Sequence, residues 1–229
     1  MKSNPLNLHE FPLWVNMQRW EMDELLRVVT IRAYRSGETL FTPLDNPDCL
    51  YLLQHGRVKT YTLTVQGQVK IMHIFCPGDA FGGLLMGAVD GQLPYAEAVG
   101  DVIVCSVRKE GFTLMMQRCP NTCFGLFRYL AAHHEEDMRR IEQLLHSKAQ
   151  HRVIFALFSL AERLGMDHKA EFSIYPHFTH EDIANMIGLR RTTVSEIISQ
   201  LRKAGVIAGT GRRFKVKRKE AERYLEKKK

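Results

Sequence analysis

The sequence predicts an α+β fold, in which a front half of short strands is followed by one long amphipathic helix and a basic, mainly helical back half. Between residues 31 and 107, short runs of β-branched, aromatic and leucine residues alternate with turn sequences. Residues 120–147 place apolar side chains at helical spacing, with Gly125 as the one internal helix breaker. Cations concentrate after residue 145. These observations predict domains at residues 1–119, 120–147 and 148–229.

The composition is that of an ordinary globular chain. Its 229 residues are 45% hydrophobic and 25% charged, which excludes wholesale disorder and allows a sizeable core. No apolar run approaches the ~20 residues needed to cross a bilayer, and the N-terminus lacks the apolar stretch of a secretory signal. The number of cysteines, 5, is odd and argues against a disulfide framework. We therefore expect a cytoplasmic protein without a membrane partner.

The net charge of +7 is unevenly distributed along the chain. Residues 1–145 hold 14 Lys and Arg against 16 Asp and Glu, a net charge of −2. Residues 146–229 hold 18 against 9, a net charge of +9. A near-neutral front and a strongly basic back indicate that only the back half contacts a polyanion. A solvated surface with a frayed lysine tail would show the same charge, so both interpretations stay open on charge alone.

The front half carries the strands. Turn sequences such as Ser36-Gly37, Gln66-Gly67 and Pro77-Gly78-Asp79 separate the apolar runs. Many short strands at close spacing predict a small barrel or roll, here an N-terminal β-roll over residues 1–119. The clearest predicted strands are Leu50–Leu53, Val58–Leu63, Val69–Phe75 and Val102–Val107.

A long helix is predicted from Pro120, which suits a first helical turn, to about residue 147. Its apolar side chains form an a/d seam over three heptads, at Phe124, Phe127, Ala131, His134, Met138, Ile141 and Leu145. A seam this regular usually meets a copy of itself, so we expect dimerisation, although packing on its own domain would use the same pattern. His134, the polar member, is expected to be tolerated or to set the register rather than to bind a ligand.

Two further elements follow a short hinge near Ser147–Gln150. Apolar residues from Val153 to Leu164 mark an amphipathic helix, which Gly165 ends. Phe172–Tyr175 has the composition of a strand.

The most specific signal is the stretch FTHEDIANMIGLRRTTVSEIISQLRKAGVI, residues 178–207. Thr179 and Asp182 have the spacing of a capping box that opens a helix. Gly188 permits the left-handed backbone of a tight turn, and a second helix starts near Arg190 or Arg191. This is the pattern of a helix-turn-helix, whose second helix enters the DNA major groove. A plain helical hairpin would need neither the polar residues at the start of the second helix nor a basic flank.

The polar residues of this stretch suit the chemistry of DNA. Arg191 can donate two hydrogen bonds to guanine, Glu196 can accept one from the cytosine amino group, and Thr179 is placed for a phosphate. Residues 206–207 and 214–216 predict a two-stranded wing whose tip turns cations toward phosphates. The predicted DNA-binding residues are Thr179, His180, Arg190, Arg191, Thr192, Ser195, Glu196, Ser199, Arg202, Arg212 and Arg213.

Nearly the whole chain resembles one family of transcription regulators. The segments YRSGETLF, LYLLQHGRVKTY, FCPGDAFGG and IANMIGLRRTTVSEIISQLRKAGVI are similar to those of the CRP/FNR (catabolite activator and fumarate-nitrate) regulators. The resemblance implies a cyclic-nucleotide-binding-like β-roll (a double-stranded β-helix), a dimerisation helix and a winged helix-turn-helix. It implies a homodimer that binds a palindromic operator in double-stranded DNA, contacts RNA polymerase, and responds to a small-molecule effector or to a redox or gas signal sensed in the roll.

The recognition helix departs from the family pattern at two positions. The common R-E-T-V-S-R is replaced here by Arg191-Thr192-Thr193-Val194-Ser195-Glu196. Arg191 matches the arginine that reads guanine, whereas Thr192 and Glu196 replace a glutamate and an arginine. The family's operator sequence therefore does not carry over directly.

The resemblance places an effector pocket at Phe81, Gly82, Gly83, Leu84, Tyr95 and Ala96. The cyclic-nucleotide branch has Gly-Glu and Arg-Ser or Arg-Thr where this chain has Gly82-Gly83 and Tyr95-Ala96. No Lys or Arg occurs from Ile71 through Val107, so a bound phosphate would lack an ion-pair partner there. We therefore expect a small, mostly uncharged or apolar effector, or none, rather than a cyclic nucleotide.

Other sensing chemistries stay open as alternatives. The first cysteine is Cys49, so the N-terminal cysteine cluster of the iron–sulfur branch is not expected. Cys119 and Cys123 could oxidise or share a metal, yet two thiols fill only half of a tetrahedral site. Cys-Pro pairs at residues 76–77 and 119–120 are a weak haem-thiolate pattern, for which Met72 and His55 would be axial candidates, and His73 lies near Cys76. Our expectation is no bound cofactor and no metal.

Two alternatives belong to other classes of protein. A cupin-like metalloenzyme would use closely spaced His and carboxylate ligands, but the roll has only His55 and His73, with no H-x-H. Nucleophile-elbow and phosphate-loop motifs are also missing from the sequence. A cyclic-nucleotide module without DNA binding would not need residues 178–216. The sequence therefore predicts a DNA-binding regulator and not an enzyme.

Overall fold

A computed structural model describes residue 11 and residues 18–45, 48–86, 93–146, 148–163, 171–174, 178–208 and 214–226. The chain forms two compact units. The first comprises Met1–Thr62 with Met72–Glu136, and the second comprises Leu63–Ile71 with Asp137–Lys229.

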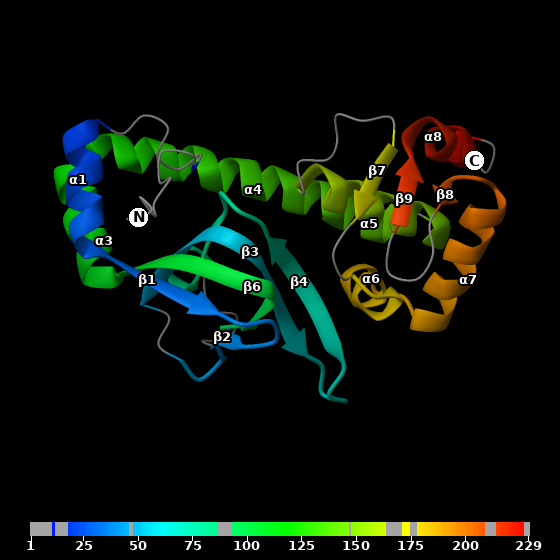
Figure 1. The fold of residues 1–229 in the computed structure, drawn as a ribbon, viewed down its shortest axis with the longest axis horizontal. Coiled ribbons are helices and arrows are strands. Elements are labelled where there is room, and N and C mark those ends of the chain that lie inside the picture. The colour runs from blue at the N-terminus through cyan, green and yellow to red at the C-terminus, as the bar shows by residue number, and fades with distance from the viewer. Residues whose placement is uncertain are drawn as a thin grey trace, which may run out of the picture. The chain divides into compact units, whose positions relative to one another are not determined.

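The first unit is built on an antiparallel sheet with the order β1-β6-β3-β4, in which β2 also pairs with β6 and β5 with β3 (Figure 1). Its strands are β1 (Val29–Tyr34), β2 (Thr39–Phe41), β3 (Cys49–Leu63), β4 (Val69–Phe75), β5 (Ala80–Phe81) and β6 (Tyr95–Arg108). This is the predicted roll, and β4 has the predicted bounds.

Strand β3 joins two segments that the sequence predicted as separate strands. The ladder to β6 is irregular between Leu53 and Arg57, and Gly56 there has φ +81°. A Cβ at Gly56 would collide with the carbonyl oxygen of Asp101 and with Val102, so the kinked strand requires glycine. The single strand β3 therefore pairs with β6 on both sides of the irregularity, from Cys49 to Tyr61.

Alternating side chains of the sheet supply two cores. Leu50, Leu52 and Val107 contribute to a core shared with the helices of the first unit. Leu53 and Val104 contribute to the interior of the roll, with side chains from β2, β4 and β5. The period-two alternation of a pleated sheet accounts for this division.

The helices of the first unit pack against one face of the sheet. They are α1 (Arg19–Val28), the short α2 (Gly83–Met86), α3 (Lys109–Arg118) and the first part of α4 (Pro120–His146). Helix α3 approaches α1 closely at Gly111, where the absence of a side chain leaves room for Val28. A Cβ at Gly111 would lie only 2.9 Å from the Cβ of Val28. Helix α4 begins at Pro120, as predicted.

The second unit contains the basic back half. Its helices are the end of α4, α5 (Ala149–Arg163), α6 (His180–Ile187), α7 (Arg191–Lys203) and α8 (Arg218–Glu226). A three-stranded sheet with the order β7-β9-β8 accompanies them, formed by β7 (Glu171–Ile174), β8 (Ile207–Ala208) and β9 (Phe214–Lys217). Buried apolar side chains of α5, α6 and α7 form the centre of this unit. Among the described residues, no helix is long and apolar enough to span a membrane.

Candidate nucleic-acid interface and effector segment

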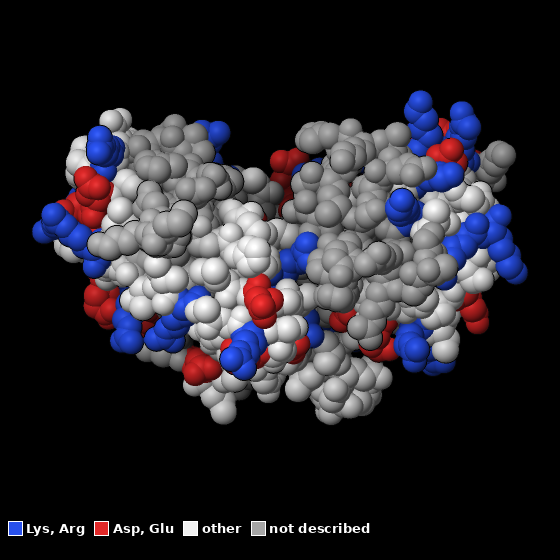
Figure 2. All heavy atoms as spheres, in the orientation of Figure 1, with Lys and Arg blue, Asp and Glu red and all other residues white. Residues whose placement is uncertain are grey.

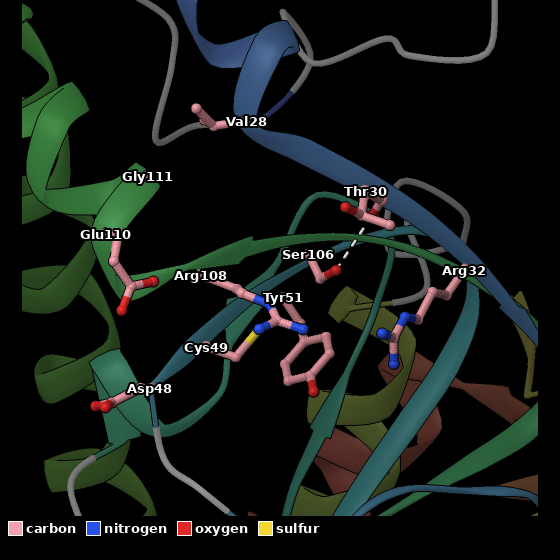
Figure 3. A pocket seen from close by; sticks show the side chains of 10 residues that line it. All are labelled: Val28, Thr30, Arg32, Asp48, Cys49, Tyr51, Ser106, Arg108, Glu110 and Gly111. Atoms are coloured by element: carbon pink, nitrogen blue, oxygen red, sulfur yellow. Dashed lines mark hydrogen bonds between the residues drawn. The ribbon is translucent and has the colours of Figure 1, made fainter.

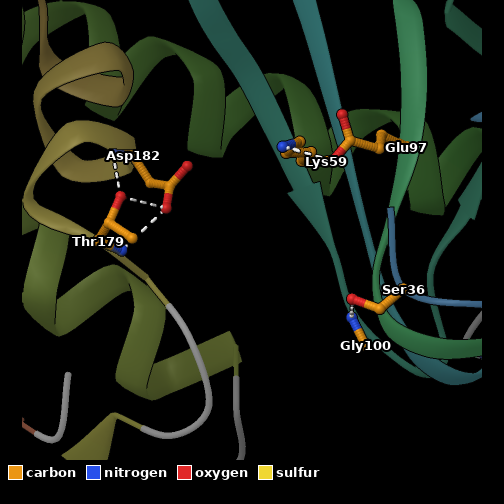
Figure 4. A network of polar contacts seen from close by, with 6 residues as sticks. All are labelled: Ser36, Lys59, Glu97, Gly100, Thr179 and Asp182. Atoms are coloured by element: carbon orange, nitrogen blue, oxygen red, sulfur yellow. Dashed lines mark hydrogen bonds and ion pairs between the residues drawn. The ribbon is translucent and has the colours of Figure 1, made fainter. Parts of the chain in front are cut away.

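Helix α6 begins with the predicted capping box (Figure 4). The Asp182 amide donates to Thr179 Oγ1 at 3.1 Å, and the Thr179 amide donates to Asp182 Oδ2 at 2.8 Å. The Thr179 hydroxyl also donates to Asp182 Oδ2 at 2.7 Å. Because that hydroxyl proton is directed to Asp182, the structure gives Thr179 a capping role and leaves it no proton for a phosphate.

The turn between α6 and α7 is fixed by glycine and by two arginines. Gly188 adopts the left-handed conformation expected of it, with φ 65° and ψ 34°. Arg140 Nη2 donates to the carbonyl oxygen of Met186 at 2.9 Å, and Arg152 Nη1 to that of Ile187 at 3.2 Å. Cationic donors suit the negative end of a helix dipole, so these contacts hold the end of α6 in place. The sequence patterns did not indicate either arginine.

Helix α7 separates an apolar face from a polar one. Its inner face buries the four predicted residues, Val194, Ile197, Ile198 and Leu201. Its outer face exposes Arg191, Thr192, Glu196 and Ser199, and Arg190 is exposed at the N-cap. The predicted base-reading side chains therefore lie together on one solvent-facing side of a helix thirteen residues long.

Two predicted DNA contacts bind each other. Nδ1 of His180, in the first turn of α6, lies 2.8 Å from Ser195 Oγ on α7. Burial lowers the pKa of His180, and the nearby cations Arg202 and Arg191 lower it further. A neutral imidazole then joins the two helices of the motif. Ser195 is half-buried, so its hydroxyl is less accessible to DNA than the exposed side chains of α7. The fifteen-residue separation of the pair explains why no local pattern revealed it.

The predicted wing is present as two paired strands. Ile207 pairs with Val216 and Ala208 with Lys215 in an antiparallel ladder. Arg212 and Arg213, at the predicted tip, lie outside the described residues. A third strand, β7, joins the other side of β9, so the wing is anchored on both edges of that strand.

Positive charge gathers around this motif. Figure 2 shows blue side chains over α7 and α8 in the second unit. The end of α7 contributes Arg202 and Lys203, and β9 contributes Lys215 and Lys217, whereas the three cations of α8 are balanced by its three glutamates. A basic field beside an exposed recognition helix attracts a polyanion and is expected to strengthen binding at low salt.

The predicted seam of α4 is open to solvent. Relative exposure is 71% for Phe124 and Phe127, 46% for Met138, 45% for Ile141 and 72% for Leu145. Ala131 and His134 are exposed as well. A different face of the same helix packs on the roll through buried Tyr129, whose hydroxyl donates to Ala80 O and accepts from Ala80 N, both at 2.7 Å. The alternative that the seam packs within its own domain is therefore not what the structure shows.

The predicted effector residues do not form one group. Phe81 and Ala96 are fully buried in the interior of the roll, where the Phe81 ring stacks on Phe75 and Tyr51. Gly82 has φ +110°, and a Cβ there would lie 2.5 Å from the carbonyl oxygen of Cys49. Gly83 begins α2, and Leu84 packs against the helix-facing core instead.

Tyr95 lies on the other face of its strand. The burial of β6 alternates, with Ala96 and Ala98 inside the roll and Tyr95 and Glu97 partly exposed. Tyr95 stacks on Tyr61 with ring centroids 5.1 Å apart. Adjacent residues of a strand point to opposite faces, so Tyr95 and Ala96 cannot both line the interior.

The structure brings a cation from another strand next to β6, although residues 71–107 themselves contain no Lys or Arg. Lys59 lies opposite Glu97 in the β3–β6 ladder, and Nζ is 2.7 Å from Glu97 Oε1 (Figure 4). Lys59 therefore lies close to Ala96, but its charge is already balanced by the carboxylate of Glu97. The same view shows Gly100 N donating to Ser36 Oγ at 3.3 Å, a contact that ties a roll turn.

The cysteines form no recognisable site. None of the five cysteines forms a disulfide, and the described residues contain no group of three or more His, Cys, Asp or Glu able to hold a metal. Burial raises the pKa of the Cys119 thiol, which opposes the activation expected at a helix start.

Comparison with known proteins agrees with this architecture. The family described as cyclic nucleotide-binding domain matches residues 31–119, and the Crp-like helix-turn-helix domain matches residues 151–221. The fumarate and nitrate reduction regulatory protein of Escherichia coli (strain K12) is 26% identical over 203 residues, which cover 88% of this chain and 80% of that protein. The Klebsiella oxytoca fumarate nitrate reduction regulatory protein is also 26% identical, over 84% of this chain and 77% of its own length.

Solved structures share the fold. FixK2 from Bradyrhizobium japonicum superposes with a TM-score of 0.73 at 24% identity, over 86% of this chain and 96% of that one. A CooA mutant from Carboxydothermus hydrogenoformans gives a TM-score of 0.72 at 18% identity, over 98% of this chain and 96% of that one. Sensor roll, long helix and helix-turn-helix occur in the same order, and the chain belongs to the CRP/FNR family of transcription regulators, which are not enzymes.

Proposed function

We propose that this regulator is a cytoplasmic homodimer that binds a palindromic operator in double-stranded DNA through α7 and recruits or blocks RNA polymerase in response to an effector. The exposed polar face of α7 is the observation that carries the proposal. Arg191 in its first turn is placed to read a guanine, while Thr192, Glu196 and Ser199 supply donors and acceptors for neighbouring bases.

Two copies are needed for a palindromic site. The exposed apolar seam of α4 supports association, because a monomer would leave two phenylalanines at 71% exposure on one helix face. A second copy of the same helix would cover both seams at once, which gives a symmetric dimer with two recognition helices.

A selection on randomised duplexes tests the reading role of Arg191. We expect Arg191→Ala to lose roughly 1–3 kcal/mol per half-site and to relax preference at one guanine. The matched control is Arg35→Ala, which removes one charge from an exposed turn of the roll. If Arg191→Ala and the wild type select the same site with the same preference, α7 does not read DNA in this register.

We further propose that the roll takes an uncharged or apolar effector. Stacked aromatic rings give its interior an apolar character, Gly83 and Tyr95 replace the residues that hold a cyclic nucleotide, and Lys59 is already paired with Glu97. Cyclic AMP should therefore leave the melting temperature unchanged. A ligand at about 100 times its dissociation constant would add about 2.7 kcal/mol of stability, so a clear upward shift with cyclic AMP would contradict the proposal.

A further inference from the structure

A solvent-open hollow of the first unit is lined by residues of β1, β3 and β6 and by the start of α3. Its volume is about 730 Å³, within the range of about 300–1,000 Å³ found for small-molecule sites. Its lining is formed by Val28, Thr30, Arg32, Asp48, Cys49, Tyr51, Ser106, Arg108, Glu110 and Gly111 (Figure 3). None of the residues predicted for the effector pocket belongs to this lining.

Two guanidinium groups face this hollow. Figure 3 shows the Tyr51 ring between the side chains of Arg32 and Arg108. Cys49 shares a side-chain hydrogen bond with Tyr51, and the charges of Arg32 and Arg108 both act on the Cys49 thiol. Arg32 itself shares a side-chain hydrogen bond with Tyr34. Arg32 comes from β1 and Arg108 from the last residue of β6, and the β1–β6 ladder holds them on one sheet.

Neither guanidinium is neutralised within the part of the chain that the structure describes. No carboxylate there lies within ion-pair distance of Arg32 or Arg108. Asp48 at the rim is engaged instead by Lys109, with Oδ1 and Nζ 3.5 Å apart. Glu110 is exposed at the rim. When Lys109 is counted together with Asp48, the two arginines exceed the remaining carboxylate, Glu110, by one positive charge.

The remaining lining adds directional contacts. Arg108 is the N-cap residue of α3, and Glu110 and Gly111 in the first turn of that helix also line the hollow, so the positive end of the helix dipole lies beside it. Ser106 is nearly buried at the floor, where its hydroxyl donates to the carbonyl oxygen of Thr30 at 3.2 Å. The hydroxyl oxygen can still accept, and the Tyr51 ring, which stacks on Phe41 and Phe81 on the side of the roll interior, adds an aromatic wall to the hollow.

From this arrangement we infer that the hollow is a binding site for a small organic anion carrying carboxylate or phosphate groups. Arg32 and Arg108 would clamp the acidic groups from two sides, since a guanidinium matches a carboxylate or phosphate with paired hydrogen bonds. Tyr51 would contact the organic part. The inference does not depend on the nature of the ligand in the roll interior, or on DNA binding.

Titration calorimetry on the full chain tests the inference with succinate and inorganic phosphate as probes. We expect at least one probe to bind, and the preferred probe distinguishes a carboxylate ligand from a phosphate ligand. Arg32→Gln and Arg108→Gln should each weaken binding by roughly tenfold to 100-fold, the loss of a charge-assisted hydrogen bond. The matched control is Arg27→Gln, because Arg27 pairs with Glu24 at 2.6 Å and does not line the hollow.

A measurement on the wild type covers the case in which a variant fails to fold. Hydrogen exchange monitored by mass spectrometry should show slower exchange at residues 28–32 and 106–111 when the bound probe is present. The inference is overturned if neither probe binds, if Arg27→Gln weakens binding as much as the two pocket variants, or if the protected peptides lie elsewhere.

Discussion

At the scale of single residues, the helix-turn-helix depends on polar contacts that also limit what its side chains can do. His180 and Ser195 are joined at 2.8 Å, and burial and two arginines keep the imidazole neutral. Thr179 is occupied by its capping box. We therefore expect base reading to rest mainly on the exposed side chains of α7, with Arg191 foremost among them.

The His180 pair predicts a pH dependence of stability. The folded-state pKa lies below the ordinary value of 6.5, so the unfolded chain binds the proton more readily. The resulting stabilisation is fully present above pH 6.5 and is lost as the pH falls through the folded-state pKa. Denaturant unfolding of the wild type and His180→Gln at a series of pH values should show the wild type losing more stability on acidification. Parallel curves would mean that His180 is not perturbed.

At the scale of elements, most strands and the helices α4 to α7 follow from local patterns, whereas α8 was not predicted. The capping box at Thr179, the left-handed Gly188 and the bounds of β4 were all predictable, because each is set by neighbours in sequence. What escaped prediction depends on residues far apart. Arg140 and Arg152 reach carbonyls of α6 46 and 35 residues away.

In the candidate sites, too, the contacts that escaped prediction join residues that are far apart in the sequence. The pairing of Lys59 with Glu97 requires the β3–β6 register, and the Arg32–Arg108 hollow requires the β1–β6 ladder. Side-chain direction also decided an outcome, since Tyr95 and Ala96 are adjacent in sequence but face opposite sides of β6. Helices α1 and α3 were not predicted; α3 contains Gly111, which lowers helix propensity but allows close packing on Val28.

Tyr129 connects two elements of the first unit and yields a prediction at this scale. Its hydroxyl satisfies both backbone groups of Ala80, directly before Phe81, so Tyr129→Phe leaves a buried donor and acceptor unpaired. We expect a loss of about 1–3 kcal/mol and a melting temperature lower by several degrees. Tyr61→Phe is the control, because the Tyr61 hydroxyl has no hydrogen bond among the described residues. Equal melting temperatures for the two variants would show that the Ala80 contacts contribute nothing.

At the scale of the whole molecule, the two apolar faces of α4 have different roles. One face carries Tyr129 and packs on the roll, while the seam presents phenylalanine, methionine, isoleucine and leucine to solvent. An apolar stripe of this length on a monomer would favour aggregation, whereas pairing with a second copy would cover it. In the proposed dimer, α4 would contact both its own sensor unit and the partner, which would give an effector a physical route to the DNA-binding unit.

Met138→Glu tests whether the seam is the dimer contact. The residue is 46% exposed, so the substitution should be tolerated by the isolated fold. In a symmetric dimer it would bring two carboxylates together inside an apolar interface, where desolvation and like-charge repulsion both oppose association. Sedimentation should therefore show mainly monomer, and affinity for a palindromic operator should fall steeply. Ala132→Glu adds the same charge at an exposed position beside the seam and should leave the dimer intact. A Met138→Glu protein that remains dimeric would require a contact surface other than the α4 seam.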